Sequence, residues 1–515
     1  MEQKIIWYSR KTGAITQEQK ELQAEKESGQ KKQVEMNVIG VYPNYVLQEM
    51  DGYGCAMTES AAYVLQNMKP EQRKKALNAW FGKDGINASF VRVPIDSCDY
   101  ALSEYQAVED PIADPDFTTF SISRDKKYII PVLKEIMEIR QGKLEVLLTP
   151  WSPPAAWKTA PEIVENDAAV YGGSAEKRDF TKPGRSFGGR LRPEYYGAWA
   201  RYLVKYIRAY REEGIPVTML SIQNETNAAT DWDSCVWSGK EIKIFLTHYL
   251  YPELSACGLQ KEIQIFIWDH NKERVYERPC DIVDKTTKNM IEQVMDENTS
   301  EMIRGFAYHW YSGDHFEALS LAAQKYPGKI LMHSESCPIH LPEKAVFYDV
   351  PEKERRKLSP EQQKLFEIPA AEVNYQDAVD YAHDILGDLN HGMNRWIEWN
   401  AILDWKGGPR HVGGGFGSIL LAEEDGSCKI LPAYEYVKLI AQTVKPGAKR
   451  IGISFCDDGI EGTAVKNTDG SIGIVLLNSK EKDRKITIRI CGYLIPIQLA
   501  AHTLSSVNMR ADIVE

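Results

Sequence analysis

Eight short apolar segments rich in valine, isoleucine and leucine recur in the first four fifths of the chain. Segments with helical periodicity lie between them, such as 69–82, 194–214 and 375–392, and Gly214 ends the second of these. Strands that alternate with helices pair in parallel, so eight such units predict a closed (β/α)8 TIM barrel. An open doubly wound sheet is the alternative, but no glycine-rich phosphate-binding turn follows the first segment. The eight predicted strands are 46–54, 89–95, 144–151, 217–225, 263–270, 303–311, 329–336 and 395–403.

After about residue 436 the chain changes to closely spaced strands, with Asp469-Gly470 as a hairpin signal. These strands predict a small antiparallel β-sandwich, which the N-terminal strands near Ile5–Tyr8 and Val38–Val41 complete. The charged stretch 15–35 is expected to be a solvated helix or loop. We therefore expect three parts: residues 1–45 joining the sandwich, 46–435 forming the barrel and 436–515 forming the sandwich. The predicted C-terminal strands are 449–456, 461–467, 471–478, 484–490 and 494–507.

The chain has 515 residues and a formal net charge of −11, which argues against nucleic acid as a partner because phosphate binding relies on a basic surface. No segment approaches the roughly 18 apolar residues of a membrane span. The first residues lack the apolar region of a signal peptide. The nine cysteines are scattered singly, which favours free thiols in a reducing compartment. These features predict a cytoplasmic protein.

In a TIM barrel the chemistry lies at the carboxyl ends of the strands. Here these ends carry carboxylates, tryptophans and hydrogen-bonding groups. This mixture suits the cleavage of a glycosidic bond, in which one carboxyl group gives a proton and another attacks the anomeric carbon. Aromatic faces pack on the apolar face of a sugar, while polar groups bind its hydroxyls. The residues at the ends are Arg92, Asp99, Trp151, Asn224, Glu225, Asp269, His270, His309, Trp310, Tyr311, Glu335, Trp399 and Asn400.

Glu225 and Glu335 are the predicted catalytic pair. Glu225 follows Asn224, whose amide is placed to hold the 2-hydroxyl of the sugar beside an acid that keeps its proton. Glu335 is expected near Arg92 and Tyr311, donors that would hold it ionised. Glu225 is therefore assigned as the acid/base and Glu335 as the nucleophile. A retaining mechanism requires about 5–5.5 Å between the two carboxyl groups.

Each position also has a simpler interpretation. A glutamate at a strand end is commonly a solvated loop residue, Trp151 and Trp399 suit a core, and His309 suits a hydrogen-bonded packing role. Cys98 and Cys337 lack the histidine context of a nucleophilic thiol. No metal-ligand spacing occurs among the ten histidines, so we predict no metal and no cofactor. The conjunction at the barrel rim favours the catalytic interpretation.

Seven motifs follow one another along the chain: DGYGCAMTES (51–60), VRVPIDSCDY (91–100), TPWSPPAAWKT (149–159), IQNET (222–226), AYHWY (307–311), SESC (334–337) and WIEWN (396–400) followed by GGP (407–409). In this order they resemble glycoside hydrolase family 30, which includes glucosylceramidases. The resemblance implies a retaining β-glycosidase with a (β/α)8 barrel and a β-sandwich built from both termini. It implies the same roles for Glu225 and Glu335, and support of the nucleophile by Arg92. It places Asp99, Trp151, Asn224, His309, Tyr311 and Trp399 around the sugar.

Some features depart from the family pattern. Arg410 and His411 stand where relatives often place asparagine, at the far edge of the sugar subsite. The loops 158–189 and 338–373 are longer than expected and leave from carboxyl ends, so both should stand over the active-site mouth. The first loop is basic, which suits either a solvated surface or contact with an anionic group of the substrate. Its basic residues are Lys177, Arg178, Lys182, Arg185 and Arg190.

These features predict a retaining β-glycosidase, of β-glucosidase or glucosylceramidase type, that acts on a small or oligosaccharide β-glycoside by double displacement. One alternative keeps the mechanism with a β-xyloside, a β-glucuronide or a β-1,6-glucan. Another is a sugar-binding protein without turnover, which the presence of both glutamates with Arg92 and Asn224 disfavours. The sequence makes no prediction of the oligomeric state.

Overall fold

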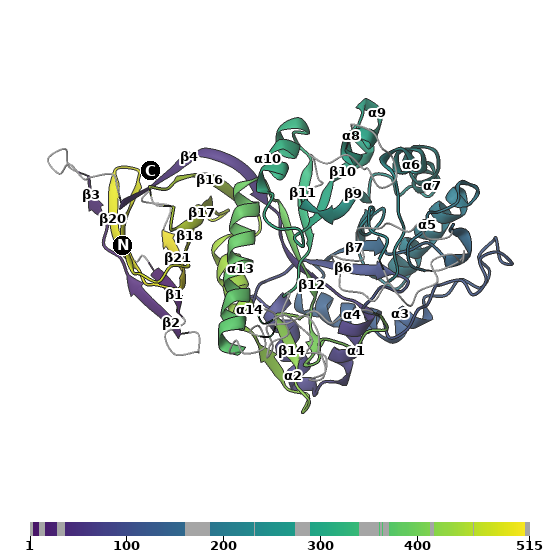
Figure 1. The fold of residues 1–515 in the computed structure, drawn as a ribbon, viewed down its shortest axis with the longest axis horizontal. Coiled ribbons are helices and arrows are strands. Elements are labelled where there is room, and N and C mark those ends of the chain that lie inside the picture. Colours follow the sequence, from purple (N-terminus) through teal and green to yellow (C-terminus); the bar gives the residue numbers. More distant parts are fainter. Residues whose placement is uncertain are drawn as a thin grey trace.

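The structure is a computed structural model. It describes residues 4–9, 16–27, 37–159, 186–230, 232–272, 289–338, 360, 363, 370–412, 417–456 and 458–509. Two parts are visible in Figure 1: a β-sandwich that holds both ends of the chain, and a barrel surrounded by helices. No helix among the described residues is long and apolar enough to cross a membrane.

Eight strands close a parallel barrel, in the order β10-β11-β12-β5-β6-β7-β8-β9. Each of the eight predicted segments overlaps one of them, so the predicted barrel is confirmed. The first segment divides at Asp51, because residues 46–50 extend a sandwich strand and only the residues after Asp51 enter the barrel. The barrel strands are β5 (Gly52–Ala56), β6 (Phe90–Ile95), β7 (Glu145–Pro150), β8 (Val217–Ser221), β9 (Gln264–Asn271), β10 (Ile303–His309), β11 (Ile330–Glu335) and β12 (Arg395–Asn400).

Helices surround the barrel, and their apolar faces form one large core with the outward-facing strand residues. In α5 the aromatic residues recur every three or four positions, which places Tyr202, Tyr206 and Tyr210 on one buried face. Gly214 follows this helix with φ of 82°, as the predicted helix end requires. The helices are α1 (Glu59–Asn67), α2 (Pro70–Phe81), α3 (Ser123–Lys127), α4 (Ile129–Ile139), α5 (Tyr196–Glu212), α6 (Gly239–Phe245), η5 (Leu246–Leu250), α7 (Tyr251–Ala256), α8 (Met290–Val294), α9 (Glu297–Met302), α10 (Phe316–Lys325), α13 (Ala370–Asn390) and α14 (Pro432–Thr443), with short 3-10 turns η2 (Ala155–Trp157) and η4 (Pro193–Tyr195).

The sandwich is a ten-stranded sheet in the order β2-β1-β21-β18-β17-β16-β4-β19-β20-β3. Strands from both ends of the chain alternate in it, and isoleucine, leucine and valine side chains form its own core. Most pairs are antiparallel, but β4 and β19 are parallel. The strands are β1 (Lys4–Ser9), β2 (Thr16–Glu21), β3 (Glu25–Lys26), β4 (Val38–Met50), β16 (Ala448–Ser454), β17 (Glu461–Lys466), β18 (Ile472–Asn478), β19 (Arg484–Ile490), β20 (Tyr493–Leu499) and β21 (Thr503–Met509).

Two predictions for the sandwich are wrong. Where it is described, the charged stretch 15–35 contains strands β2 and β3 in place of a helix or loop. Both lie at the ends of the sheet, and edge strands are commonly rich in charged residues, which hides their apolar pattern. The predicted strand 494–507 is two strands, because the chain turns before β21, with φ of 55° at His502.

Helices α13 and α14 join the two parts. Thr443 at the end of α14 donates a hydrogen bond to Ser506 of β21 (2.7 Å), and Asn390 at the end of α13 donates to the carbonyl of Gly462 in β17 (2.9 Å). A third small sheet lies beyond β12, with β13 (Leu403–Asp404), β14 (Leu420–Ala422) and β15 (Cys428–Ile430).

Gly387 allows α13 to approach Phe316 of α10. A Cβ atom at Gly387 would lie 2.1 Å from Cζ of Phe316. The ring of Phe316 also stacks on His391, with 5.3 Å between centroids, and lies under the ammonium of Lys272. The ring therefore gives up these contacts if it moves away.

We expect Gly387→Ala to lower the free energy of unfolding by about 1–2 kcal/mol. Overpacking costs about 1–3 kcal/mol, which outweighs the gain of about 1 kcal/mol that alanine brings to a helix. Gly197→Ala in α5 is the matched control, because its new Cβ would lie in ordinary contact, 3.6 Å from Cδ1 of Tyr249, and should be neutral or stabilising. Urea denaturation measures both variants. In a Phe316→Ala background Gly387→Ala should become stabilising, and equal stabilisation in both backgrounds would contradict the packing argument.

Candidate active site

The inside of the barrel is built in layers. An apolar layer fills its lower part. Because side chains alternate along a strand, the residues two positions further on face the same interior, nearer the carboxyl ends. These residues are mostly polar and fully buried. The apolar layer contains Phe90, Leu147, Met219, Phe266, Ala307, Ile330, Met332 and Ile397, and the layer above it contains Arg92, Thr149, Ser221, His309, Ser334 and Trp399.

Strand β9 departs from this alternation. Trp268 and Asp269 have φ of 79° and 49°, and the pairing of β9 with β10 shifts register at this point. Trp268 consequently packs in the core outside the barrel, and the carboxylate of Asp269 enters the interior. Residues other than glycine rarely adopt such angles, and they concentrate at functional sites.

Arg92 lies at the centre of the polar layer, with its side chain fully buried. Its guanidinium donates to Oε2 of Glu335 (2.5 Å), Oδ1 of Asn224 (2.7 Å) and Oδ2 of Asp269 (3.1 Å). Burial lowers the pKa of Arg92, but the charges of Asp269 and Glu335 more than offset this and raise it. The planar guanidinium thus links the ends of β11, β8 and β9.

Glu335 is the last residue of β11, and both of its carboxylate oxygens are held. Arg92 binds one, and the phenol of Tyr311 donates to the other at 3.0 Å. Glu335 is 6% exposed, at the edge of a cavity. The carboxylate is therefore oriented from two sides and still reaches the cavity.

Glu225 lies in a tight turn after β8, with φ of 47°. Its backbone N–H donates to the carbonyl of Asp269 (2.8 Å), and that of Asn224 donates to the carbonyl of Pro150 (2.9 Å). The neighbouring strands β7 and β9 thus hold the turn in a conformation that costs about 1–3 kcal/mol. The carboxylate of Glu225 lies 3.2 Å from Nδ1 of His309.

The two glutamates lie close together. One carboxylate oxygen of Glu225, one of Glu335 and a ring nitrogen of His309 all lie within 4.8 Å of one another. Retaining glycosidases hold their carboxyl groups about 5–5.5 Å apart, whereas inverting enzymes need about 6.5–9.5 Å to admit a water molecule. The spacing fits the retaining class.

His309 bridges two carboxylates, because its Nε2 lies 3.0 Å from Oδ1 of Asp269 while its Nδ1 faces Glu225. Burial lowers the pKa of His309, but the charge of Glu335 and the hydrogen bonds to Asp269 and Glu225 raise it to about 9. At neutral pH the ring is therefore an imidazolium that donates from both nitrogens. Burial also raises the pKa of Asp269, but Arg92 and His309 lower it below its usual range.

The cavity above the glutamates has aromatic walls. Trp151 and Trp399 stack with 5.0 Å between ring centroids, and Arg92 lies 4.7 Å from the centroid of Trp151. All the predicted site residues except Arg92 and His309 line the cavity, and those two contact the carboxylates from behind. The lining residues are Asp99, Trp151, Asn224, Glu225, Trp232, Tyr311, Glu335 and Trp399.

Asp99 has a free acceptor at this cavity. Its Oδ1 is buried and has no hydrogen-bond partner among the described residues. Burial, with the charges of Glu335 and Asp233, raises the pKa of Asp99 well above its usual range. An unsatisfied buried carboxyl group is costly, so a ligand hydroxyl at this position would be strongly favoured.

Two residues of the site, Asp269 and Trp232, were not predicted as site residues from the sequence. Asp269 stands at the end of the predicted strand 263–270, and its position there was the available signal. Its inward orientation depends on the register shift in β9, which no local sequence pattern indicates. Trp232 lies in the loop after β8, where no periodicity indicates which side chains turn inward.

The structure describes only some of the residues that were predicted to lie around the active-site mouth. Lys177, Arg178, Lys182 and Arg185, and most of the loop 338–373, lie outside the described residues. Arg190 forms an ion pair with Glu241 (2.6 Å). His411 lies 3.2 Å from Asp233 and joins the loop after β12 to the loop after β8.

Two groups in the described part of the chain have the residue types of a metal site. One is Glu225, His309 and Glu335; the other is His333, Asp384 and Asp388. In the second group Lys272 already supplies the positive charge, with its ammonium bonded to both aspartates. In the first group the positive charges are those of Arg92 and of His309 itself.

Comparison with known proteins identifies the family. The family model described as "Glycosyl hydrolase family 30 TIM-barrel domain" matches residues 50–349 and 360–424, and "Glycosyl hydrolase family 30 beta sandwich domain" matches residues 447–507. The chain belongs to glycoside hydrolase family 30. It is thus a glycosidase with the retaining mechanism that the spacing of the carboxyl groups fits.

Relatives of this family 30 enzyme include proteins of different specificity. The Lysosomal acid glucosylceramidase of Mus musculus is 22% identical over 462 residues, which are 88% of this chain and 79% of that protein. SrfJ from Salmonella typhimurium is 27% identical, with a TM-score of 0.79 and 99% of each chain covered. The endo-beta1,6-glucanase BT3312 is 26% identical, with a TM-score of 0.76, and 99% of this chain and 100% of that chain are covered.

We expect Arg92→Lys in this family 30 enzyme to lower kcat by about 100-fold or more. A single ammonium group cannot span the three acceptors on three strands, so Glu335 loses its fixed orientation, and a small misplacement of reacting groups costs about 10²-fold. Steady-state kinetics on an aryl β-glycoside measures the loss. Arg395→Lys is the control, because Arg395 is a buried arginine at the amino end of β12 that binds Asp51. If both variants lose activity equally, Arg92 has no special role.

His309 should make stability depend on pH. Its pKa in the folded protein, about 9, lies above its ordinary value of 6.5, so its contribution is fully present below pH 6.5 and is lost as the pH rises through 9. The shift corresponds to about 3 kcal/mol. His309→Gln should remove this part of the decline in the free energy of unfolding, which denaturant unfolding measures between pH 6 and 9.5. His383→Gln, in a more exposed ion pair with Glu461, should change the slope less. An unchanged slope in His309→Gln would contradict the assigned charge.

Proposed function

We propose that the protein is a retaining β-glucosidase in which Glu335 is the nucleophile and Glu225 is the acid/base. The observation that carries this proposal is the pair of carboxylates within 4.8 Å at the mouth of the barrel, one of them held by Arg92 and Tyr311. The two hydrogen bonds to Glu335 leave it aimed at the cavity as an attacking group. The carboxylate of Glu225 faces the rings of His309 (3.2 Å) and His270 (3.8 Å), which suits a group that exchanges a proton.

In the proposed first step, Glu335 attacks the anomeric carbon and Glu225 gives its proton to the leaving oxygen, forming a covalent glycosyl-enzyme. In the second step Glu225 takes a proton from water, and the resulting nucleophile releases the sugar from Glu335. Arg92 and His309 place two positive charges beside three carboxyl groups, those of Glu225, Asp269 and Glu335. The proposed acid role requires a protonated Glu225 at the start of the cycle.

The sugar is proposed to lie against Trp151 and Trp399, with its hydroxyls bound by Asp99 and Asn224. Asn224 is supported in this role by its hydrogen bond from Arg92, which fixes its amide beside Glu225. Tyr311 and Trp232 complete the walls. His309 acts from behind Glu225 and Arg92 from behind Glu335, so both are positioning residues.

Glucose is the proposed sugar, because glucosylceramidase and beta1,6-glucanase are the activities named for the relatives above. A sphingolipid glucoside is the first candidate substrate. A β-1,6-glucan is the second, and the alignment of the glucanase over the whole of both chains favours it. β-Xylosides and β-glucuronides are the further alternatives for the same mechanism.

The test is a panel of nitrophenyl β-D-glucoside, xyloside, galactoside and glucuronide with two matched variants. Glu335→Gln should lower kcat at least about 10³-fold on every active substrate. Glu225→Gln should cost about 10²–10⁴-fold on poor leaving groups and far less on a dinitrophenyl glucoside, whose departure needs no proton. Glu145→Gln, at the amino end of β7, is the control.

Added azide separates the two roles. It should give the α-glucosyl azide with Glu335→Ala, after one inversion, and the β-glucosyl azide with Glu225→Ala, after two. Activity that survives Glu335→Gln would overturn the assignment of the nucleophile. A panel without any turnover would favour a sugar-binding protein.

A further inference from the structure

The outer face of the sandwich carries a cluster of exposed apolar side chains on β4. Tyr42 is 52% exposed, Tyr45 66% and Val46 50%. Strand β4 pairs with β16 between Gly40 and Met50, and with β19 from Val38 to Val41. Exposed aromatic groups gathered on a sheet face are uncommon on a surface with no partner.

Glycines set the position of these rings. Gly40 pairs with Ser454 on one side and Arg489 on the other. A Cβ at Gly40 would lie 2.5 Å from Oη and 2.9 Å from Cζ of Tyr42, so the phenol end of Tyr42 lies directly over Gly40. The hydroxyl groups of Tyr42 and Ser454 are 3.0 Å apart and hydrogen-bonded, which fixes the ring.

A second glycine supports the neighbouring tyrosine. A Cβ at Gly452 would lie 3.2 Å from Cβ of Tyr42 and 3.2 Å from Cβ of Tyr45. Gly452 therefore leaves room for two tyrosines side by side on the sheet. Because both are more than half exposed, each offers apolar ring surface to a ligand.

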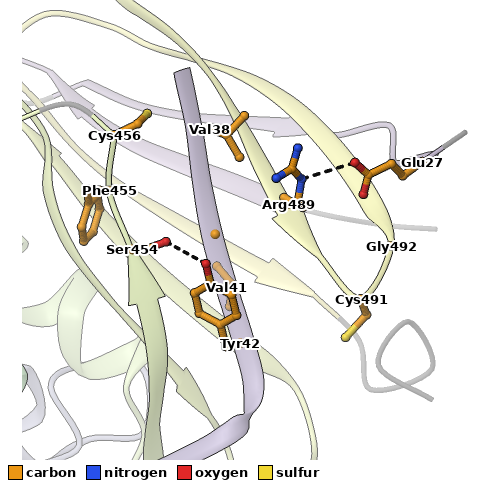
Figure 2. Close-up of a pocket in the computed structure, with 11 residues that line it drawn as sticks. Glu27, Val38, Val41, Tyr42, Ser454, Phe455, Cys456, Arg489, Cys491 and Gly492 are labelled. Atoms are coloured by element: carbon orange, nitrogen blue, oxygen red, sulfur yellow. Dashed lines mark hydrogen bonds and ion pairs between the residues drawn. The ribbon is translucent and has the colours of Figure 1, made fainter. Parts of the chain in front are cut away.

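Next to Tyr42 lies a cleft of about 420 Å³ with polar walls. Figure 2 shows Tyr42 and Ser454 on one side of β4, and Arg489 facing Glu27 on the other. Nε of Arg489 lies 3.4 Å from Oε1 of Glu27. The cleft thus combines an aromatic face, hydroxyl groups and a donor and acceptor of balanced charge.

We propose that this surface, the Tyr42–Tyr45 platform with the adjoining cleft, is a second saccharide-binding site that takes a neutral chain of β-linked glucose. A pyranose has an apolar C–H face for the rings and hydroxyls for Ser454, Arg489 and Glu27. The balanced pair of Arg489 and Glu27 suits a neutral ligand better than an anionic lipid or a nucleic acid. The choice of glucan rests on the proposed function.

The platform is separate from the catalytic cavity. Strand β4 reaches the barrel at Asp51, at the amino end of β5, whereas Glu225 and Glu335 lie at the carboxyl ends. A glucan bound there would hold the enzyme on a long substrate without touching the reacting bond. The site should therefore matter for a polymer and not for a small glucoside.

The test uses the full chain with Glu335→Gln, so that substrate is bound and not cleaved, and measures retention in a gel that contains soluble β-1,6-glucan. Tyr42→Ala and Tyr45→Ala should each weaken binding about tenfold, the usual effect of deleting an important aromatic contact. Tyr42→Phe keeps the ring and should bind nearly as the parent does. Tyr63→Ala, an exposed tyrosine of α1, is the matched control.

In otherwise unaltered enzyme, Tyr42→Ala and Tyr45→Ala should raise KM on the glucan and leave kcat/KM on nitrophenyl glucoside unchanged. Unaltered glucan retention in both variants would overturn the second site. Two other results would also overturn it. Loss of binding to phosphatidylcholine vesicles in place of glucan would assign the surface to lipid. A change of oligomeric state in Tyr45→Ala would assign it to a second copy of the chain. Failure of the proposed function is seen separately, as absent hydrolysis of nitrophenyl glucoside.

Discussion

The guanidinium of Arg92 joins three strands of the barrel through Glu335, Asn224 and Asp269. A buried cation is costly unless it is paired and all its donors are used, and removing one partner of such a pair typically costs about 3–5 kcal/mol. Those partners come from positions in the chain that meet only when the barrel closes. The geometry of the Glu225–Glu335 pair and the closure of the barrel therefore depend on the same contacts.

The polar layer around Arg92 rests on an apolar layer and uses local strain. Phe90, Met219 and Phe266 fill the barrel below it and exclude water, which strengthens the electrostatic interactions above. The left-handed backbone at Glu225 and Asp269 turns both side chains inward, and hydrogen bonds between the peptides of neighbouring strands hold it there. A bifunctional pair of carboxyl groups is thus positioned by rigid elements and not by flexible loops.

Elements with a strong local sequence pattern were predicted correctly, and elements with a weak pattern were not. The barrel strands are buried on both faces and read as continuous apolar runs, so all eight were found. Edge strands such as Thr16–Glu21 carry charges and lose that signal. The end of β4 and the start of β5 follow each other directly in the chain, and only their separate pairing divides them at Asp51. Asp269 was left out of the site because its inward turn depends on a register shift between strands.

The sequence by itself determined which segments become the barrel strands, and hence that Asn224, Glu225, His309 and Glu335 stand at or just after carboxyl ends and that Arg92 lies within β6. These features are local, since alternation and turn chemistry act between near neighbours. The tertiary structure decided the distances: that Glu225 and Glu335 lie within 4.8 Å, that Arg92 reaches Asp269, and that the ring of Tyr42 lies over Gly40. Contacts between strands depend on register, closure and packing, which form only when distant segments meet.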